Sequence, residues 1–329
     1  MCIRDRCDDI GEAAYEIESV AIGFINIIST LNKDKNANIS IKQISNRYGV
    51  DIAKAEKKLS EVIKKVDLVI EVRDARIPLS TGHPHLNKWI NNKKHILVIN
   101  RSDMISPNTI NSWNKWFNSK DQYPLWCDAK RGIGIKEICK SAKDSRSSID
   151  DRRLSRGMRI RPIRALTLGF PNVGKSALIN RIAKKRVVDS ARKAGVTRNL
   201  RWIKLESGID LLDAPGVIPP NLEDQKSALN LALCDDIGEA AYEIESVAIG
   251  FIKIISTLNK DKNANISVKQ ISNRYGVDIA KGFKSPSAWI DEAASTHTSG
   301  DKRRMSHKLL EDYRNQMLGK IALEVPLWN

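Results

Sequence analysis

Alternating runs of apolar and polar residues predict a β-sheet in the middle of the chain. Short runs of residues typical of strands stand at 96–99, 124–127, 164–168, 200–205 and 209–212. The third run leads through a glycine-bearing loop into residues 174–184, where Ala177, Leu178 and Ile182 fall on one face of a helix. Strands that alternate with helices in this way predict an α/β fold, a mostly parallel sheet with helices on both faces.

The pattern becomes entirely helical after Pro219 and Pro220. Apolar residues at spacings of three and four predict one amphipathic helix through Ala241, Ile244, Ala248, Phe251 and Ile255. A second helix is expected to begin at Ser285-Pro286, with Trp289 and Ile290 pointing inward. We therefore expect two domains, an α/β domain at 52–222 and an all-helical domain at 223–329.

A third helical stripe in the C-terminal part is apolar on one side and basic on the other. The apolar side, which we expect to pack in the core, carries Met305, Leu309, Tyr313 and Met317. The opposite side carries Lys302, Arg303, Arg304, Lys308, Arg314 and Lys320. A solvated face and an RNA-binding face are both consistent with this basic side.

Residues 7–54 recur almost letter for letter as residues 234–281. The two copies differ at two positions, Asn26 against Lys253 and Ile41 against Val268. Repeats that stack in a fold normally drift in sequence and recur at least three times. We therefore interpret residues 1–51 as an artefactual, displaced copy of C-terminal sequence.

The segment from Gly169 to Ser176 matches the phosphate-binding loop GxxxxGK(S/T) in full. It follows a predicted strand and precedes a predicted helix, which is the context that the motif requires. Backbone N–H groups and the positive end of the helix dipole would cradle phosphates, while Lys175 would neutralise the charge of the β- and γ-phosphates. The loop predicts nucleotide binding by Pro171, Asn172, Val173, Gly174, Lys175, Ser176 and Ala177.

A string similar to the guanine-reading NKxD of GTPases, Asn100-Arg101-Ser102-Asp103, stands ahead of the phosphate loop. Asp103 is expected to accept hydrogen bonds from guanine N1 and N2, and the stem of Arg101 to stack along the purine. Asp128-Ala129-Lys130 stands where the SAK string belongs, and its Ala129 N–H is a candidate donor to guanine O6. In most GTPases the phosphate loop comes first, so this order predicts a circularly permuted GTPase that binds GTP and GDP.

The string Asp213-Ala214-Pro215-Gly216 closes the predicted strand pair and matches the DxxG of a switch II. Asp213 would hold Mg²⁺ through water, Gly216 would sense the γ-phosphate, and the Ser176 hydroxyl would coordinate the ion. Thr197 lies between the loop and this string and is the expected switch I threonine. Lys175, Thr197 and Gly216 are thus the predicted catalytic residues, and Ser176, Thr197 and Asp213 the predicted metal ligands.

The formal net charge of the chain is +16, from 55 basic and 39 acidic residues, which suits a polyanionic partner. Basic residues are concentrated at 143–164 and 181–204, which border the nucleotide motifs and favour RNA over a merely solubilising surface. The cysteines form no CxxC pair, and the apolar run from Val20 to Ile28 is too short to span a bilayer. These features predict a cytoplasmic monomer with reduced thiols and no membrane partner.

Together these strings resemble the circularly permuted ribosome biogenesis GTPases of the RbgA/YlqF type, over residues 52–329. The likeness includes Asp74-Ala75-Arg76-Ile77-Pro78 after the first strand, the permuted motif order, and His297-Thr298-Ser299-Gly300-Asp301 in the helical segment. The resemblance implies a GTPase that binds a late precursor of the large ribosomal subunit, through its rRNA, and is stimulated by it.

The resemblance also has consequences for catalysis. Val217 occupies the place of the glutamine that orients the attacking water in conventional GTPases. The family is thought to use instead a histidine ahead of Ala53-Lys54-Ala55, and that place holds Asp51. The resemblance therefore implies impaired stimulated hydrolysis with intact GTP binding, and it implies K⁺ binding by Asn172.

Three other functions fit parts of the sequence. A non-catalytic or very slow GTP-dependent RNA-binding module would explain Val217 and Asp51. A permuted GTPase of another RNA particle, such as the small ribosomal subunit, would be expected to carry an OB-fold or zinc motif, and the sequence shows neither. A phosphate-loop kinase would leave the guanine-reading string unexplained.

Overall fold

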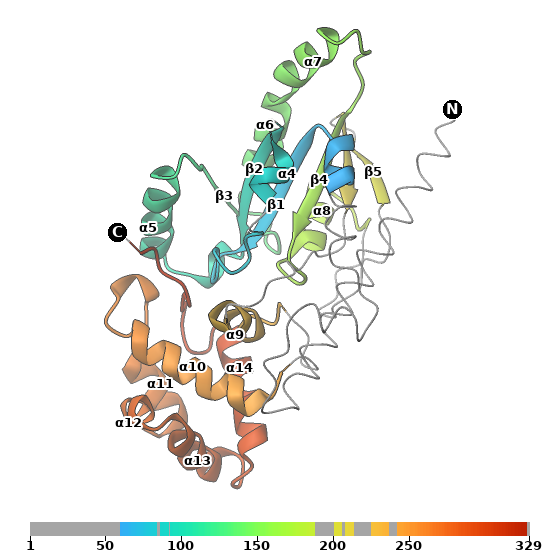
Figure 1. Cartoon of the computed structure of the whole chain (residues 1–329). Coiled ribbons are helices and arrows are strands. Elements are labelled where there is room, and N and C mark those ends of the chain that lie inside the picture. The colour runs from blue at the N-terminus through green and yellow to red at the C-terminus, as the bar shows by residue number, and fades with distance from the viewer. Residues whose placement is uncertain are drawn as a thin grey trace, which may run out of the picture.

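A β-sheet with flanking helices lies above a group of C-terminal helices in Figure 1. The computed structural model describes residues 60–83, 86–91, 93–187, 201–205, 208–213, 225–236 and 242–327. The segment 1–51, interpreted above as a displaced copy, lies outside the described residues.

The described residues contain one six-stranded sheet with the order β3-β2-β1-β4-β6-β5. The strands are β1 (Leu68–Asp74), β2 (Lys94–Asn100), β3 (Leu125–Trp126), β4 (Ile163–Gly169), β5 (Arg201–Leu205) and β6 (Ile209–Asp213). Neighbouring strands are parallel except β5 and β6, which are antiparallel. The strands predicted from the apolar runs are confirmed, as is the mostly parallel sheet.

Helices cover both faces of the sheet, as the alternating pattern predicted. On one face, Ile70 of β1 belongs to the same buried cluster as Ile138 and Leu178, which lie on α6 (Ile135–Asp144) and α8 (Lys175–Ile182). On the other face, α4 (Leu86–Ile90) and α5 (Pro107–Asn118) cover the sheet. Successive side chains of a strand point to opposite faces, so a strand buried on both sides reads as one continuous apolar run.

The C-terminal helices form a second layer around α10. They are α9 (Gln225–Leu233), α10 (Ile244–Leu258), α11 (Val268–Tyr275), α12 (Ile279–Lys284), α13 (Pro286–His297) and α14 (Lys302–Arg314). Side-chain oxygens of Ser267, Asp278 and Asp301 accept backbone N–H groups at the starts of α11, α12 and α14. Trp289 and Ile290 of α13 are buried as predicted, so the helix start at Pro286 and the inward face are confirmed.

Two expectations for the last helix are wrong. The apolar stripe does not continue to Met317, which is 49% exposed, because α14 ends at Arg314 and Gln316 takes a left-handed backbone conformation with φ of 61°. Arg314 is not part of the solvated basic face, because its guanidinium donates to the carbonyl oxygens of Ala232 (2.8 Å) and Leu233 (3.1 Å). It thereby satisfies two carbonyl groups at the end of α9.

After α14 the chain runs back to the sheet, and its last described residue, Leu327, lies beside α5 (Figure 1), where its carbonyl accepts a hydrogen bond from Trp116. On the way, Glu324 accepts hydrogen bonds from the backbone N–H groups of Leu79 (2.7 Å) and Ser80 (3.1 Å), and from Asn230 of α9 (3.1 Å). Burial raises the pKa of the Glu324 carboxyl, although these donors act in the opposite direction. Glu324 thus ties the returning chain both to the loop after β1 and to α9.

Arg76, just after β1, joins the sheet to the C-terminal helices. Its side chain is 1% exposed and donates to both carboxylate oxygens of Asp74, at 3.0 and 2.7 Å. It also donates to the carbonyl of Cys234 (3.0 Å) and lies over the ring of Tyr313, 5.8 Å from its centroid. One buried cation therefore holds three separate segments together.

No helix in the described ranges is long and apolar enough to cross a bilayer. The cysteines that the structure describes, Cys127, Cys139 and Cys234, are free thiols. Burial raises the pKa of Cys127 to about 12, so this thiol stays protonated at neutral pH.

Replacing Arg76 by alanine is expected to lower the free energy of unfolding by about 3–5 kcal/mol, because it removes one partner of a buried ion pair. Arg76→Lys keeps the charge but cannot donate to both carboxylate oxygens, so it should lower the free energy of unfolding by less than Arg76→Ala does. Urea unfolding followed by circular dichroism measures both, with exposed Arg303→Ala as the control. A loss below about 1 kcal/mol for Arg76→Ala would show that the contact is not structural.

Candidate functional site

The predicted nucleotide strings meet at one edge of the sheet, at the carboxyl ends of its parallel strands. Asn100 ends β2, Gly169 ends β4 and Asp213 ends β6, while Asp128 follows β3 by two residues. In open α/β sheets, ligands bind in the crevice outside these strand ends. The fold therefore brings together segments that are far apart in the sequence.

The phosphate-binding loop depends on glycine at two positions. Gly169 has φ of 155°, and a Cβ atom there would lie 2.3 Å from the carbonyl oxygen of Val72. Gly174 has φ of 94°, and a Cβ atom there would lie 2.2 Å from Nδ2 of Asn100. Side chains are excluded from both places by conformation and by space, so the backbone is free to wrap around a ligand.

Lys175 folds back over this loop. Its ammonium donates to the carbonyl oxygens of Gly169 (3.0 Å) and Phe170 (2.6 Å), and the residue is buried. Burial lowers the pKa of Lys175 to about 8, against the charges of Asp213 and Asp236, which act to raise it. The ammonium is thus poised beside the loop in a site of low polarity, where an anion would be strongly favoured.

Asn100 joins the guanine-reading string to the phosphate loop. Its Nδ2 donates to the carbonyl of Val173 at 2.8 Å, and its Oδ1 accepts from the backbone N–H of Ala129 at 3.0 Å. The side chain is 3% exposed, so both bonds are shielded from water. One amide therefore sets the distance between all three predicted strings.

Arg101 makes a second link, through contacts of its guanidinium that the sequence did not predict. The residue has φ of 61°, and its guanidinium donates to Asp74 (2.9 Å) and to the carbonyl of Asn172 (2.5 Å). Asp236, on the segment after α9, lies 3.8 Å away. The charged head of Arg101 thus holds the phosphate loop, and stacking of its stem on a purine stays a prediction.

The residues predicted to read the base lie close together at the end of β2 and β3. Asp103 lies in the 3₁₀ turn Ser102–Met104, is 20% exposed and accepts a hydrogen bond from Gln316 at 3.3 Å. Asp128 is buried, Lys130 is exposed, and the Ala129 N–H is already engaged by Asn100. If Ala129 donates to guanine O6, its N–H would be shared between O6 and the side-chain oxygen of Asn100.

Asn172 has a left-handed backbone, with φ of 58°, and its Nδ2 donates to the carbonyl of Asp235 at 2.7 Å. The phosphate loop is therefore hydrogen-bonded to the segment between α9 and α10. Ser176 and Ala177 follow on the first turn of α8 and are partly exposed, and Pro171 and Val173 are buried.

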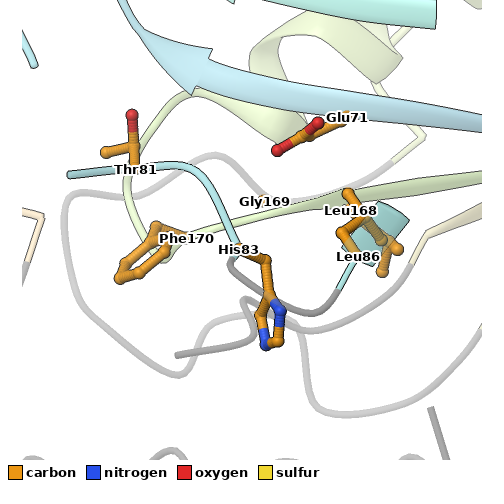
Figure 2. A pocket seen from close by; sticks show the side chains of 7 residues that line it. All are labelled: Glu71, Thr81, His83, Leu86, Leu168, Gly169 and Phe170. Atoms are coloured by element: carbon orange, nitrogen blue, oxygen red, sulfur yellow. The ribbon is translucent and has the colours of Figure 1, made fainter. Parts of the chain in front are cut away.

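A small hollow lies behind the phosphate loop, on the side of the sheet that α4 covers (Figure 2). It is lined by Gly169 and Phe170 of the loop, by Leu168, Leu86 and Glu71, and by Thr81 and His83. The ring of His83 packs against Trp89, with ring centroids 4.6 Å apart. No residue of the strings predicted to read the base lines this hollow.

Thr197 and Gly216, predicted for the two switches, lie outside the described residues, and so do Val217 and Asp51. Asp213 is described and fully buried at the end of β6. Of the three predicted metal ligands, the structure describes two: Ser176 lies in the first turn of α8, and Asp213 ends β6.

Sequence reasoning missed the buried charges around the loop. Asp236 is fully buried, and burial together with the charge of Asp74 raises its pKa to about 8. Burial also acts to raise the pKa of Asp74, but the guanidinium groups of Arg76 and Arg101 outweigh it and hold that pKa below its usual value. Nothing in the local pattern around Asp236 could have indicated these neighbours, because they come from distant segments.

The sequence profile of the 50S ribosome-binding GTPase family matches residues 164–270. The chain is 32% identical over 278 residues to the Ribosome biogenesis GTPase A of Bacillus cereus, an alignment that covers 84% of this chain and 92% of that protein. It is 35% identical over 284 residues to the Ribosome biogenesis GTPase A of Bacillus licheniformis, covering 84% and 96%.

Among solved structures, the chain is similar to GNP-bound YlqF from T. maritima, with a TM-score of 0.55 and 22% identity over 83% of this chain and 98% of that one. The GDP-bound structure of that protein gives a TM-score of 0.56 at 22% identity, covering 82% and 99%. These likenesses confirm the fold, including a C-terminal helical part.

Asp236→Asn is expected to flatten the pH dependence of stability. The folded protein holds a proton on Asp236 up to about pH 8, whereas the unfolded chain releases it near 3.8, so ionisation costs stability as the pH rises between these values. The free energy of unfolding should therefore fall more steeply from pH 5 to pH 8 in the parent than in the variant. Exposed Asp121→Asn is the control, and equal slopes for the parent and Asp236→Asn would contradict the assignment.

Proposed function

We propose, since the chain belongs to the family of ribosome biogenesis GTPase A, that it hydrolyses GTP to GDP and phosphate as a switch in the late assembly of the large ribosomal subunit. The observation that carries the proposal is the Asn100 side chain, which ties the base-reading strings to a complete phosphate loop. A phosphate-loop kinase would not need a side chain that links guanine-reading strings to the phosphate loop.

Guanine nucleotide would lie along the carboxyl edge of the sheet, with its phosphates in the loop and its base beside Asp103. Lys175 would exchange the carbonyl oxygens of Gly169 and Phe170 for phosphate oxygens, and the backbone N–H groups at the start of α8 would add further donors. Charge-assisted hydrogen bonds in a buried site are stronger than the bonds to carbonyl groups that they replace.

Ser176 and Asp213 are the described residues that would hold Mg²⁺. Hydroxyl and carboxylate oxygens are the donors that this hard cation prefers. Asp213 is fully buried, and a carboxylate in such a place is favoured by a cation close by. When bound, the ion neutralises charge on the β- and γ-phosphates. Thr197 as the third ligand and Gly216 as the γ-phosphate sensor stay part of the proposal, and so does K⁺ at Asn172.

The C-terminal helices are proposed to carry the RNA contact. Lys302, Arg303 and Arg304 at the start of α14 are exposed, although Lys302 also pairs with Asp291 at 2.6 Å. Lys308 is partly exposed on the same helix. Arg314 is removed from this face because it caps α9. A cluster of exposed cations suits rRNA phosphates and makes the binding sensitive to salt.

Nucleotide state would reach these helices through the segment after α9. Asn172 of the phosphate loop donates to the Asp235 carbonyl, and Arg101 lies near Asp236. Loss of the γ-phosphate changes the charge at the loop and so changes the balance of these contacts. This path is short because it involves two neighbouring residues of one segment.

Equilibrium binding tests the nucleotide site. The full chain is expected to bind GTP on the order of 10³- to 10⁴-fold more tightly than ATP, because adenine offers no donors to Asp103. Lys175→Ala should weaken GTP binding by about 10- to 100-fold, since it removes charged hydrogen bonds to phosphate. Exposed Lys185→Ala is the matched control. Equal affinity for GTP and ATP would remove the base-reading role of Asp103.

Turnover tests the switch. We expect purified large ribosomal subunits to stimulate GTP hydrolysis by the full chain, more strongly in an Asp51→His variant, and faster in K⁺ than in Na⁺ buffer. No stimulation of either variant, despite tight GTP binding, would support the alternative of a very slow GTP-dependent RNA-binding module. Stimulation by small subunits instead would assign the protein to another RNA particle.

A further inference from the structure

Gln316 lies just beyond the end of α14, yet its side chain reaches the carboxylate predicted to read guanine. Its Nε2 donates to Oδ2 of Asp103 at 3.3 Å and lies 2.8 Å from the sulfur of Met104. These two residues are more than two hundred positions away in the sequence. The contact brings the C-terminal helices directly to the base site.

The backbone at Gln316 is held in a conformation that favours glycine. Its φ is 61°, and its N–H donates to the carbonyl of Tyr313 at 3.0 Å, while Met317 N–H donates to the carbonyl of Asp312 at 2.8 Å. Helices that end in this way usually carry glycine at the left-handed position, because another residue there strains the backbone. A glutamine at this place therefore keeps its side chain at a conformational cost, which points to a use for the amide.

The surroundings of Asp103 leave Gln316 as its close donor among the described residues. Arg131, 65% exposed, approaches the same carboxylate oxygen at 3.9 Å, which is beyond hydrogen-bond distance. Asp103 itself is 20% exposed, so its carboxylate is open to solvent on one side. Gln316, which is half-buried, covers another side.

We propose that Gln316 is a positioning residue of the guanine site, holding one oxygen of Asp103 so that the carboxylate presents both oxygens to the base. The inference rests on the proposed function of Asp103 as the guanine reader. Rotation about the last side-chain bond of aspartate is loosely restrained, so a fixed donor on one oxygen orients the other. A carboxylate has about four acceptor positions, and guanine N1 and N2 occupy two, which leaves room for Gln316.

This geometry couples base recognition to the docking of the C-terminal helices. When the end of α14 lies against Asp103, the carboxylate is held in one orientation for guanine. When the helices move away, the carboxylate is free to rotate. Linkage is reciprocal for binding free energies, so bound guanine nucleotide favours the docked arrangement by the same factor. The C-terminal helices are therefore coupled to the nucleotide at two places, at the base through Gln316 and at the phosphate loop through the segment after α9.

The decisive variant is Gln316→Gly, because glycine adopts the left-handed backbone without strain and removes the amide, so we expect the fold to be kept. We expect the Kd for GDP to rise by about 3- to 10-fold, because the lost hydrogen bond to a charged group affects the base only through Asp103. The Kd for IDP, whose base lacks the N2 amine and cannot use the second oxygen, should rise by less than 2-fold. Competition against a fluorescent GDP analogue on the full chain measures both constants, and thermal melting checks the fold.

Two further variants make the outcome unambiguous. Asn315→Ala removes the exposed neighbouring amide and should leave both constants unchanged. Asp103→Asn should weaken GDP strongly, and in that background Gln316→Gly should have no further effect. If Asp103→Asn leaves GDP binding unchanged, the proposed base-reading function fails. If it weakens GDP but Gln316→Gly leaves GDP unchanged, tightens it, or weakens GDP and IDP equally, the role of Gln316 alone is overturned.

Discussion

Two guanidinium groups meet one buried carboxylate, Asp74, where the sheet, the base-reading string and the C-terminal helices come together. Arg76 extends from this point to the carbonyl of Cys234, and Arg101 extends to the carbonyl of Asn172 in the phosphate loop. A charge buried without partners is very costly, and moving the three segments apart would leave such charges unpaired. The segments are therefore held in one arrangement while water is excluded from the ion cluster. The position of the phosphate loop relative to the helices follows from this constraint.

The same cluster makes the predicted nucleotide site sensitive to charge. Lys175 and Asp236 are both buried near the loop, and burial moves their pKa values toward neutrality from opposite sides, each to about 8. An anionic ligand at the loop favours the charged form of Lys175 and disfavours the charged form of Asp236. Asp236 belongs to the segment after α9, so a change at the phosphates reaches the helical layer through electrostatics as well as through hydrogen bonds.

The sequence predicted the sheet and the strings at its edge well, for identifiable reasons. Strands such as β2 are buried on both faces over most of their length, so the residues from Ile96 to Ile99 form an uninterrupted apolar run. The phosphate loop is recognisable because glycine is required at Gly174, where the Asn100 amide leaves no room for a side chain. In the last helix the periodic pattern was misleading: Met317 continues the spacing of the stripe, but the helix has already ended at Arg314.

By itself, the sequence determined the fold class and the order of the strings along the chain, and it predicted the residues of a guanine-nucleotide site, because these depend on local patterns of burial and on motifs whose spacing is set by backbone geometry. Only the tertiary structure decided which distant side chains complete the site. Asp236 beside Arg101, Arg314 on the end of α9 and Gln316 on Asp103 are contacts between segments far apart in the chain. Such pairings are set by how helices pack against the sheet, and no local pattern of residues encodes them.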